Sequence, residues 1–249
     1  MKGKFTLLLL VLVAGFVVSS EAQQKKKPVK KTTVVRKKPV MAVNKSTPKY
    51  IAKKIVGTQV KITTDSGVII VRLYDSTPIH RDNFVKLVKE GFYDSLMFHR
   101  VIPQFMIQGG DPTSKYAEPA ALLGNGGDNM ERLTAEIKPQ YFHKRGVLAA
   151  ARDGNPEKKS SACQFYLVQG KKLTDAEVAM AEQRTGKKMT EAEKNIYKTE
   201  GGTPWLDGQY TVFGETIEGF DVIDKIANAP RDANNRPLGD IRMKMEIIQ

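Results

Sequence analysis

One segment of the sequence combines residue types that could act together on a bound polypeptide. Residues 98–112 read FHRVIPQFMIQGGDP, and they place an arginine, an amide and two bulky apolar side chains on two short predicted strands. Because successive side chains of a strand point to opposite faces, only one of His99 and Arg100 can face a groove. Arg100 and Gln108 could then lie on one wall. On spacing alone, an arginine on a strand is more often a surface residue or half of an ion pair.

Other reaction chemistries have little support in the sequence. His80, His99 and His143 show no metal-ligand spacing, and we expect His99 to be a buried, hydrogen-bonded residue rather than a base. Cys163 lies in a predicted strand without an evident activating base, which predicts a buried thiol. The glycine-rich residues 124–127 follow no strand–helix pattern, so a phosphate-binding loop is not indicated.

Four segments resemble the signature motifs of the cyclophilin family, and they occur in the order found in that family. They are residues 98–112, GVLAAAR at 146–152, CQFYL at 163–167 and WLDGQYTVFG at 205–214. The resemblance covers about 58–248 apart from residues 171–200. It implies a mainly β fold, a closed eight-stranded antiparallel barrel capped by two helices. It also implies a peptidyl-prolyl cis/trans isomerase that acts on proline-containing unfolded or flexible polypeptides and needs no cofactor.

The resemblance further implies a catalytic residue and a pocket for the substrate proline. Arg100 matches the catalytic arginine, and Phe105, Met106, Tyr166 and Leu206 match the apolar pocket. Tyr166 stands where many members of the family have phenylalanine. The added hydroxyl predicts a narrower or more polar pocket.

The remaining matches imply contacts around that pocket. Gln108, Ala151 and Gln164 match groups that hold the peptide backbone, and in the family a loop like residues 124–127 lies near the groove. Trp205 matches a groove-edge tryptophan that is associated with cyclosporin binding in this family. Tyr210 stands where eukaryotic members often have histidine, and it still offers a donor toward the peptide. These departures are common in bacterial-type members and weaken the expectation of a cyclosporin-type ligand.

The implied reaction suits these residue types. Rotation about an X-Pro bond faces a barrier of about 18–20 kcal/mol because resonance makes the C–N bond partly double. No bond is broken, so the enzyme has only to favour the twisted amide over both planar isomers. A guanidinium aimed at the proline nitrogen could do this, because it stays charged and holds a fixed array of donors. Two alternatives remain open: a proline-peptide binding module or holdase without turnover, and an adaptor that docks through the chain's appendages.

Periodicity and turn signals predict the elements that must position these residues. A proline near its start and Gly91 past its end predict a helix over 78–91, and a second helix is predicted over 220–228. The predicted strands cover residues 59–64, 68–73, 97–102, 105–108, 147–151, 164–168, 210–213 and 242–248.

Residues 171–200 predict a helical hairpin inserted between two strands. KKLTDAE at 171–177 recurs as KKMTEAE at 187–193, and each copy carries a capping box that marks a helix start. Leu173 and Val178 could close a hydrophobic staple over the first cap. The helices are expected to present two apolar stripes to each other or to the barrel. The stripe residues are Leu173, Ala176 and Met180, and Met189, Ala192 and Ile196. The insertion could be decorative or a substrate-selecting lid.

The net charge of +13 is confined to one segment. Residues 23–54 hold twelve Lys or Arg and no acid, whereas residues 55–249 hold 26 basic and 26 acidic residues. The basic segment with its prolines predicts a disordered linker, or alternatively a tether for an anionic surface. Since the remaining chain is near neutral, no specific nucleic-acid binding is expected.

The first 22 residues predict a secretory signal peptide. Lys2 and Lys4 precede a mostly apolar stretch over 5–18, and Ser20 and Ala22 suit cleavage before Gln23. The apolar stretch is short for a membrane span of about 20 residues, although an uncleaved anchor is the alternative. The sequence therefore predicts an exported, periplasmic protein with a domain over 55–249 and no transmembrane span after cleavage.

Overall fold

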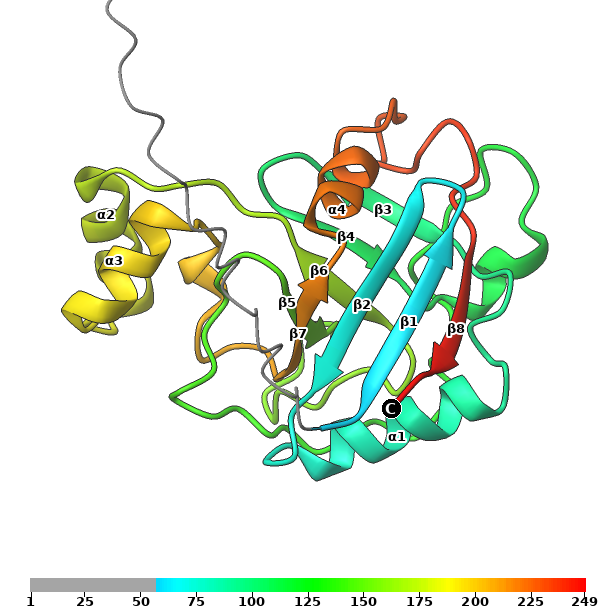
Figure 1. Ribbon diagram of the computed structural model, residues 1–249, viewed down its shortest axis with the longest axis horizontal. Coiled ribbons are helices and arrows are strands. Elements are labelled where there is room, and N and C mark those ends of the chain that lie inside the picture. Colours follow the sequence, from blue (N-terminus) through cyan, green and yellow to red (C-terminus); the bar gives the residue numbers. More distant parts are fainter. Residues whose placement is uncertain (1–56) are drawn as a thin grey trace, which may run out of the picture. The chain divides into compact units, whose positions relative to one another are not determined.

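The computed structural model describes residues 57–249, and it has a mainly β architecture (Figure 1). The predictions for the signal peptide, the basic linker and the first two residues of the domain lie outside the described residues. Eight strands form one antiparallel sheet in the order β3-β4-β6-β5-β7-β2-β1-β8. The strands are β1 (Gln59–Thr64), β2 (Gly67–Leu73), β3 (Phe98–Ile102), β4 (Met106–Gly109), β5 (Val147–Ala150), β6 (Phe165–Val168), β7 (Val212–Glu218) and β8 (Met243–Ile247).

The predicted closed barrel is not confirmed, because the sheet forms an open half-barrel. Its end strands β3 and β8 share no ladder, and the segments that precede them meet at an isolated bridge between Met97 and Arg242. The amide of Phe98 donates to the carbonyl of Ile241 at 2.9 Å beside this bridge. Alternation of polar and apolar residues is the same in open and closed sheets, so the sequence pattern could not decide this point.

Two helices cover the sheet, as predicted. The helix α1 (Pro78–Lys89) packs against β7 and β8, and α4 (Phe220–Ala227) packs against β2, β3 and β4 (Figure 1). In α1 the buried residues Phe84, Leu87 and Val88 recur at the spacing of one helical face. Two short 3-10 helices, η1 (Pro112–Tyr116) and η2 (Pro204–Leu206), were not predicted.

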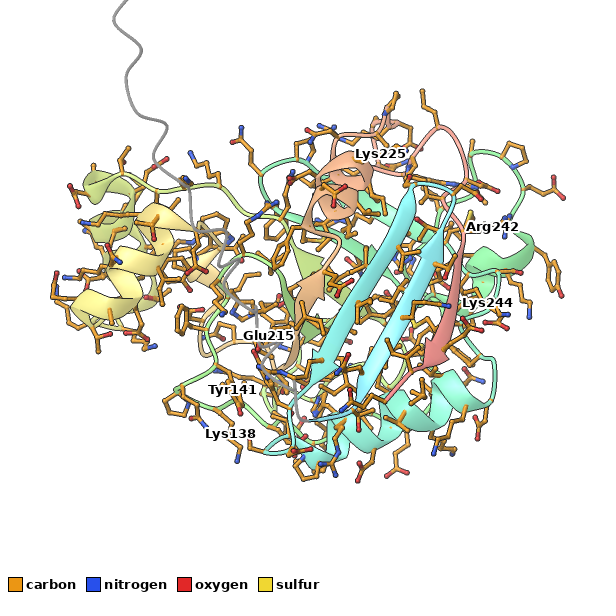
Figure 2. All side chains as sticks on the ribbon, in the orientation of Figure 1. Lys138, Tyr141, Glu215, Lys225, Arg242 and Lys244 are labelled. Carbon is orange, nitrogen blue, oxygen red and sulfur yellow. The ribbon has the colours of Figure 1, made fainter. Side chains whose placement is uncertain are left out.

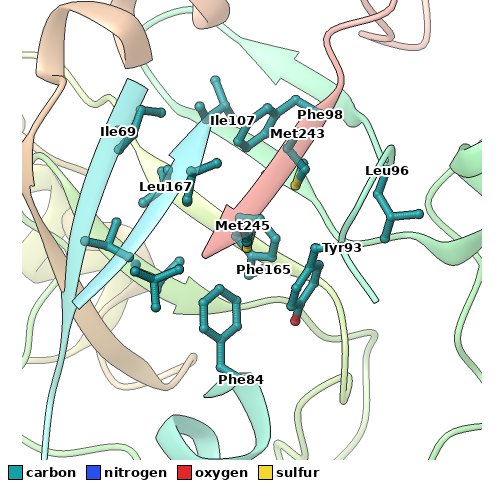
Figure 3. Packing of buried hydrophobic residues seen from close by; sticks show 14 of the residues in the cluster. Ile69, Phe84, Tyr93, Leu96, Phe98, Ile107, Phe165, Leu167, Met243 and Met245 are labelled. Atoms are coloured by element: carbon teal, nitrogen blue, oxygen red, sulfur yellow. The ribbon is translucent and has the colours of Figure 1, made fainter. Parts of the chain in front are cut away.

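The core lies on the inner face of the sheet and is organised around Phe165 (Figure 3). The rings of Phe84, Tyr93 and Phe98 each meet the Phe165 ring edge-on or nearly so, with centroids 5.6 to 6.1 Å apart. Such edge-to-face pairs add to the stabilisation that burial alone provides. Since Phe165 points inward, its neighbour Tyr166 must face the other side of the sheet.

The inserted hairpin consists of α2 (Asp175–Thr185) and α3 (Glu191–Thr199), which lie side by side away from β8 (Figure 1). Both predicted capping boxes are present, formed by Thr174 with Glu177 and by Thr190 with Glu193. Gly186 ends α2 in the left-handed conformation at a φ of 68°.

The predicted apolar stripes of the hairpin are wrong in part. Leu173 and Met189 are buried, but Ala176, Met180 and Ala192 are exposed, and Met180 keeps 66% of its surface. The buried cluster consists of Leu173, Val178, Ala181, Met189 and Tyr197. Its members include Leu173 and Val178, the pair expected to close the staple. The apolar periodicity did not predict that Tyr197 is buried, because tyrosine occurs on both polar and apolar faces of helices.

The outer surface of the described domain carries charges of both signs (Figure 2). Glu215 accepts a hydrogen bond from Arg72 and lies 3.2 Å from the ammonium of Lys144. Lys244 pairs with Glu246 at 3.6 Å on β8. Over residues 57–249, no helix has both the length and the apolar character that a membrane span needs.

Candidate active site

A β-bulge at His99 sets the direction of Arg100. Phe98 pairs with Gly109 and Arg100 pairs with Gln108, so His99 is an extra residue on its strand. Bulges of this kind re-aim side chains. Across the sheet, Gln108 pairs in turn with Tyr166, and Tyr166 pairs with Ala149. The row formed by these pairs lies on the outer face of the sheet, opposite the core.

Arg100 is held by an amide and not by a carboxylate. Its Nη1 donates to Oε1 of Gln108 at 3.3 Å, and Nε2 of Gln108 donates to Oε1 of Gln164 at 3.0 Å. Gln164 Nε2 donates to the carbonyls of Gly124 and Gly126, both at 2.9 Å. Within residues 57–249, Arg100 makes no ion pair. Burial lowers the pKa of Arg100 from 12.5, but a guanidinium remains charged in proteins. The cation is therefore fixed in place and not neutralised.

A cavity of about 110 Å³ opens beside Arg100 on the outer face of the sheet. Met106 and Tyr166 form its buried part, with exposures of 2% and 4%. It is smaller than pockets for drug-sized ligands, which measure about 300–1,000 Å³. Its size suits one small apolar ring. The lining residues are Arg100, Phe105, Met106, Gln108, Ala151, Arg152, Tyr166, Leu206 and Tyr210.

Eight of the ten site residues predicted from the sequence line this cavity. The two others lie close by. Gln164 lines an adjoining cavity of about 410 Å³, which shares Gln108, Ala151 and Arg152 with the first. The Trp205 ring lies beside the Phe105 ring, with centroids 6.1 Å apart. The glycine-rich residues 124–127 border the adjoining cavity, as expected for a loop near the groove.

The comparisons with known proteins agree with this geometry. Residues 59–246 match the family of cyclophilin type peptidyl-prolyl cis-trans isomerase/CLD. The chain belongs to the cyclophilin family. A relative from Staphylococcus saprophyticus, named as a peptidyl-prolyl cis-trans isomerase, is 35% identical over 79% of this chain and 95% of its own length. One from Staphylococcus haemolyticus with the same name is 34% identical over 76% of this chain and 91% of its own length.

Solved cyclophilin structures share the fold. A cyclophilin type isomerase from Cryptosporidium parvum superposes with a TM-score of 0.59 at 26% identity, covering 78% of this chain and 99% of its own. A second structure of that protein, determined in the presence of the dipeptide Ala-Pro, gives a TM-score of 0.57, covering 77% and 99% of the two chains. The family and the relatives establish that this cyclophilin is a peptidyl-prolyl cis-trans isomerase by type.

The Tyr166 hydroxyl does not make the pocket more polar in the way expected. It is hydrogen-bonded to Nε2 of His143 at 2.9 Å, and the His143 ring is fully buried behind the pocket wall. The hydroxyl is therefore engaged on the side away from the cavity, which meets the tyrosine ring. The hydroxyl that distinguishes Tyr166 from phenylalanine therefore has a hydrogen-bond partner, His143, within this cyclophilin.

Two residues near the pocket were missed by sequence reasoning. Arg152 lines both cavities, and its guanidinium carbon lies 4.8 Å from the centre of the Tyr210 ring. Its position directly after Ala151 was the available signal. His143 lies outside any strand or helix, and no local pattern connects it to Tyr166. Among residues 57–249, no group of three His, Cys, Asp or Glu side chains is placed to hold a metal ion.

His99 is buried as predicted, but the expected hydrogen bond is absent. Its side chain is 3% exposed, and neither ring nitrogen has a hydrogen-bond partner among the described residues. Cys163 is a buried thiol, as predicted, and burial raises its pKa. Burial is the main cause that lowers the pKa of His99 from 6.5 to about 4, and Arg100 adds to it while Asp111 opposes it.

This cyclophilin should lose stability as the pH falls from 7 to 4.5. The unfolded chain binds a proton on His99 near pH 6.5, whereas the folded protein binds it only near pH 4. Protonation therefore favours the unfolded state, and the free energy of unfolding should fall by about 2 kcal/mol through His99. Urea denaturation at both pH values measures this.

The matched variant for this test is His99→Leu. Burial also lowers the pKa of His80, so some loss should persist in the variant, and the difference between the two proteins isolates His99. An equal loss in both proteins would show that His99 titrates normally.

Proposed function

We propose that Arg100 and the small cavity beside it catalyse X-Pro rotation in exported polypeptides and thereby assist their folding. The observation that carries this proposal is a guanidinium, fixed by Gln108 and without an ion-pair partner among the described residues, on the wall of a small cavity that also has apolar side chains in its lining. In a merely structural role, a half-buried arginine would be expected to meet a carboxylate. An arginine left unpaired at a cavity is available to a substrate.

The mechanism follows from the electronic change during rotation. In the twisted amide the resonance between carbonyl and nitrogen is lost, and the proline nitrogen becomes a better hydrogen-bond acceptor. Donors of Arg100 that meet this nitrogen stabilise the twisted state more than either planar isomer, which is the condition for catalysis. Phe105, Met106, Tyr166 and Leu206 hold the proline ring while the other side of the bond turns. No bond to carbon breaks, so the step needs no nucleophile.

The peptide backbone is held across the wall shared by the two cavities. Gln108 and Ala151 belong to both linings, and Gln164 continues into the larger one. A peptide with its proline in the small cavity would place a neighbouring side chain in the larger one. The structure from Cryptosporidium parvum was determined in the presence of the dipeptide Ala-Pro, and such a dipeptide is the shortest molecule with an X-Pro bond that the present chain could act on.

The exported location rests on the leader-like residues 1–22. A protein exported by this leader would meet polypeptides before they are folded. The mature chain should then begin at Gln23, which mass spectrometry of protein purified from the producing cell can show. A mature chain that still begins at residue 1 or 2 would favour an uncleaved anchor or an internal location.

The folding role is tested with a protein whose refolding is limited by X-Pro isomerisation. Catalytic amounts of the parent should accelerate that slow phase, and Arg100→Ala should not. An isomerase without turnover on proteins would accelerate a short peptide and leave the refolding unchanged. A binding module or holdase would accelerate neither and would slow refolding only at stoichiometric amounts.

A further inference from the structure

A continuous chain of buried hydrogen bonds joins the inserted hairpin to the wall of the proline pocket. The Tyr197 hydroxyl in α3 donates to Oδ2 of Asp207 at 2.7 Å. Oδ1 of Asp207 accepts from the backbone amide of His143 at 2.8 Å and lies 3.0 Å from its Nδ1. Nε2 of the same histidine lies 2.9 Å from the Tyr166 hydroxyl. Four residues thus connect the insertion to the pocket.

The chemistry of these groups gives the hydrogen bonds their directions. A carboxylate only accepts, so Nδ1 of His143 carries a hydrogen, and in the neutral imidazole Nε2 is then the acceptor. Tyr166 donates to this neutral form of His143. Burial raises the pKa of both Tyr166 and Tyr197, so both phenols keep their protons as donors. The two tyrosine hydroxyls at the ends of the chain are directed by the carboxylate between them.

All four members are removed from solvent. His143 and Tyr197 are fully buried, and Tyr166 and Asp207 are 4% and 5% exposed. A donor or acceptor that loses its partner in such a place pays the full cost of desolvation, so the set is expected to keep one arrangement. The His143 and Tyr166 rings lie nearly parallel, at 13°, with centroids 6.1 Å apart.

The insertion is packed closely where it meets this chain. Phe142 precedes His143 in the sequence, and its ring meets the Tyr197 ring edge-on, with centroids 5.5 Å apart. At Gly202 an added Cβ would come within 2.3 Å of the His143 carbonyl and 2.7 Å of the Tyr197 ring. Any larger residue at position 202 would push α3 and His143 apart, so glycine is needed for this close approach. The hairpin is therefore seated directly behind the pocket wall.

We propose that the inserted hairpin is a positioning element of the active site, and that Tyr197 is its positioning residue. Through Asp207 and His143, Tyr197 orients the Tyr166 ring, which forms part of the wall of the proline pocket. The inference rests on the proposed role of that cavity as the proline site. It replaces both earlier alternatives for residues 171–200, since a decoration would not reach the pocket and a lid would cover it from the front.

The test is a double-mutant cycle on the full chain with an Ala-Pro-containing peptide. Tyr197→Phe removes one hydroxyl and keeps the ring. Loss of the Tyr197 hydroxyl should weaken binding of the proline ring equally in the ground state and in the twisted state. KM should therefore rise while kcat stays nearly unchanged. The loss of one buried hydrogen bond predicts a rise in KM of about fivefold.

Tyr166→Phe removes the far end of the chain and is the second arm of the cycle. In that background there is no hydroxyl for His143 to hold, so adding Tyr197→Phe should change KM by less than about twofold. Tyr93→Phe is the matched control, because Tyr93 is also buried and its hydroxyl donates to the Cys163 carbonyl inside the core. It should lower the melting temperature without changing KM in either background.

Three outcomes would overturn the inference. KM could stay unchanged in Tyr197→Phe, the effects could multiply in the double variant, or Tyr93→Phe could raise KM as much. If Tyr197→Phe does not fold, Thr190→Ala takes its place, because it removes the cap of α3 and so loosens the helix that holds Tyr197 against Asp207. It should raise KM in the same direction and leave kcat nearly unchanged, and an unchanged KM would count against the inference. Failure of the proposed function has a different signature, namely an Arg100→Ala variant that retains the parent's activity whatever Tyr197 does.

Discussion

Replacing Arg100 with alanine should lower kcat/KM for an Ala-Pro-containing peptide by about a hundredfold to a thousandfold. The guanidinium is held by Gln108 and has no ion-pair partner among residues 57–249. It can therefore meet the proline nitrogen without first breaking a salt bridge. The apolar side chains of the cavity, Phe105, Met106 and Leu206, remain in the variant, so the loss should come from the twisted state and not from the fold. A coupled or exchange assay of isomerisation measures the ratio.

Two matched variants serve as controls for Arg100→Ala. Arg100→Lys keeps the charge but loses the planar array of donors, so it should recover only a small part of the activity. Arg72→Ala removes an arginine of another strand that pairs with Glu215, and it should stay within about twofold of the parent because Arg72 lines neither cavity. An Arg100→Ala variant with more than a third of the parent's activity would remove Arg100 from the mechanism.

Replacing Asp207 with alanine should lower the free energy of unfolding by about 3–5 kcal/mol. The carboxylate accepts from the His143 amide, the His143 ring and the Tyr197 hydroxyl. Its removal leaves three donors buried without an acceptor, and each carries a desolvation cost of about 1–3 kcal/mol. Chemical denaturation measures the change, and the fit should keep the same dependence on denaturant.

The control for this prediction is Asp240→Ala. Asp240 pairs with Arg236 and Arg242 near the surface, with its side chain 40% exposed. Exposed pairs contribute little, so the loss should stay below about 1 kcal/mol. If Asp207→Ala cost no more than Asp240→Ala, the buried chain from Tyr197 to Tyr166 would not exist as a cooperative unit.

The strands and the residues of the pocket could be predicted because their signals are local. Alternation places Phe165 and Tyr166 on opposite faces of one strand, and the resemblance of residues 163–167 to a cyclophilin motif implies that Tyr166 belongs to the pocket. Capping boxes likewise mark the starts of both inserted helices within four residues. The strand β7 runs beyond its predicted end at 213 because Glu215 and Thr216 take their strand conformation from pairing with β2. Residues distant in sequence set that boundary.

The features that the sequence did not predict depend on contacts between distant segments. Whether the sheet closes depends on where the ends of β3 and β8 fall in space. His99 is the extra residue of a bulge, and a bulge leaves no mark in the pattern of residue types. The partner of the Tyr166 hydroxyl lies 23 residues away in the sequence. Tyr197 meets Asp207 because the hairpin folds back against η2, which Asp207 directly follows.

The central claim is that Arg100 acts on the twisted amide and not on peptide binding. The measurement that tests it is the affinity of an Ala-Pro-containing peptide for the parent and for Arg100→Ala, set beside the isomerisation rate on each saturated protein. Trp205, the one tryptophan of the chain, lies beside Phe105 at the pocket and can report binding by its fluorescence. We predict that the affinity changes by less than about threefold while the rate falls by at least about a hundredfold. An affinity that falls in parallel with the rate would contradict the claim and assign Arg100 to substrate binding.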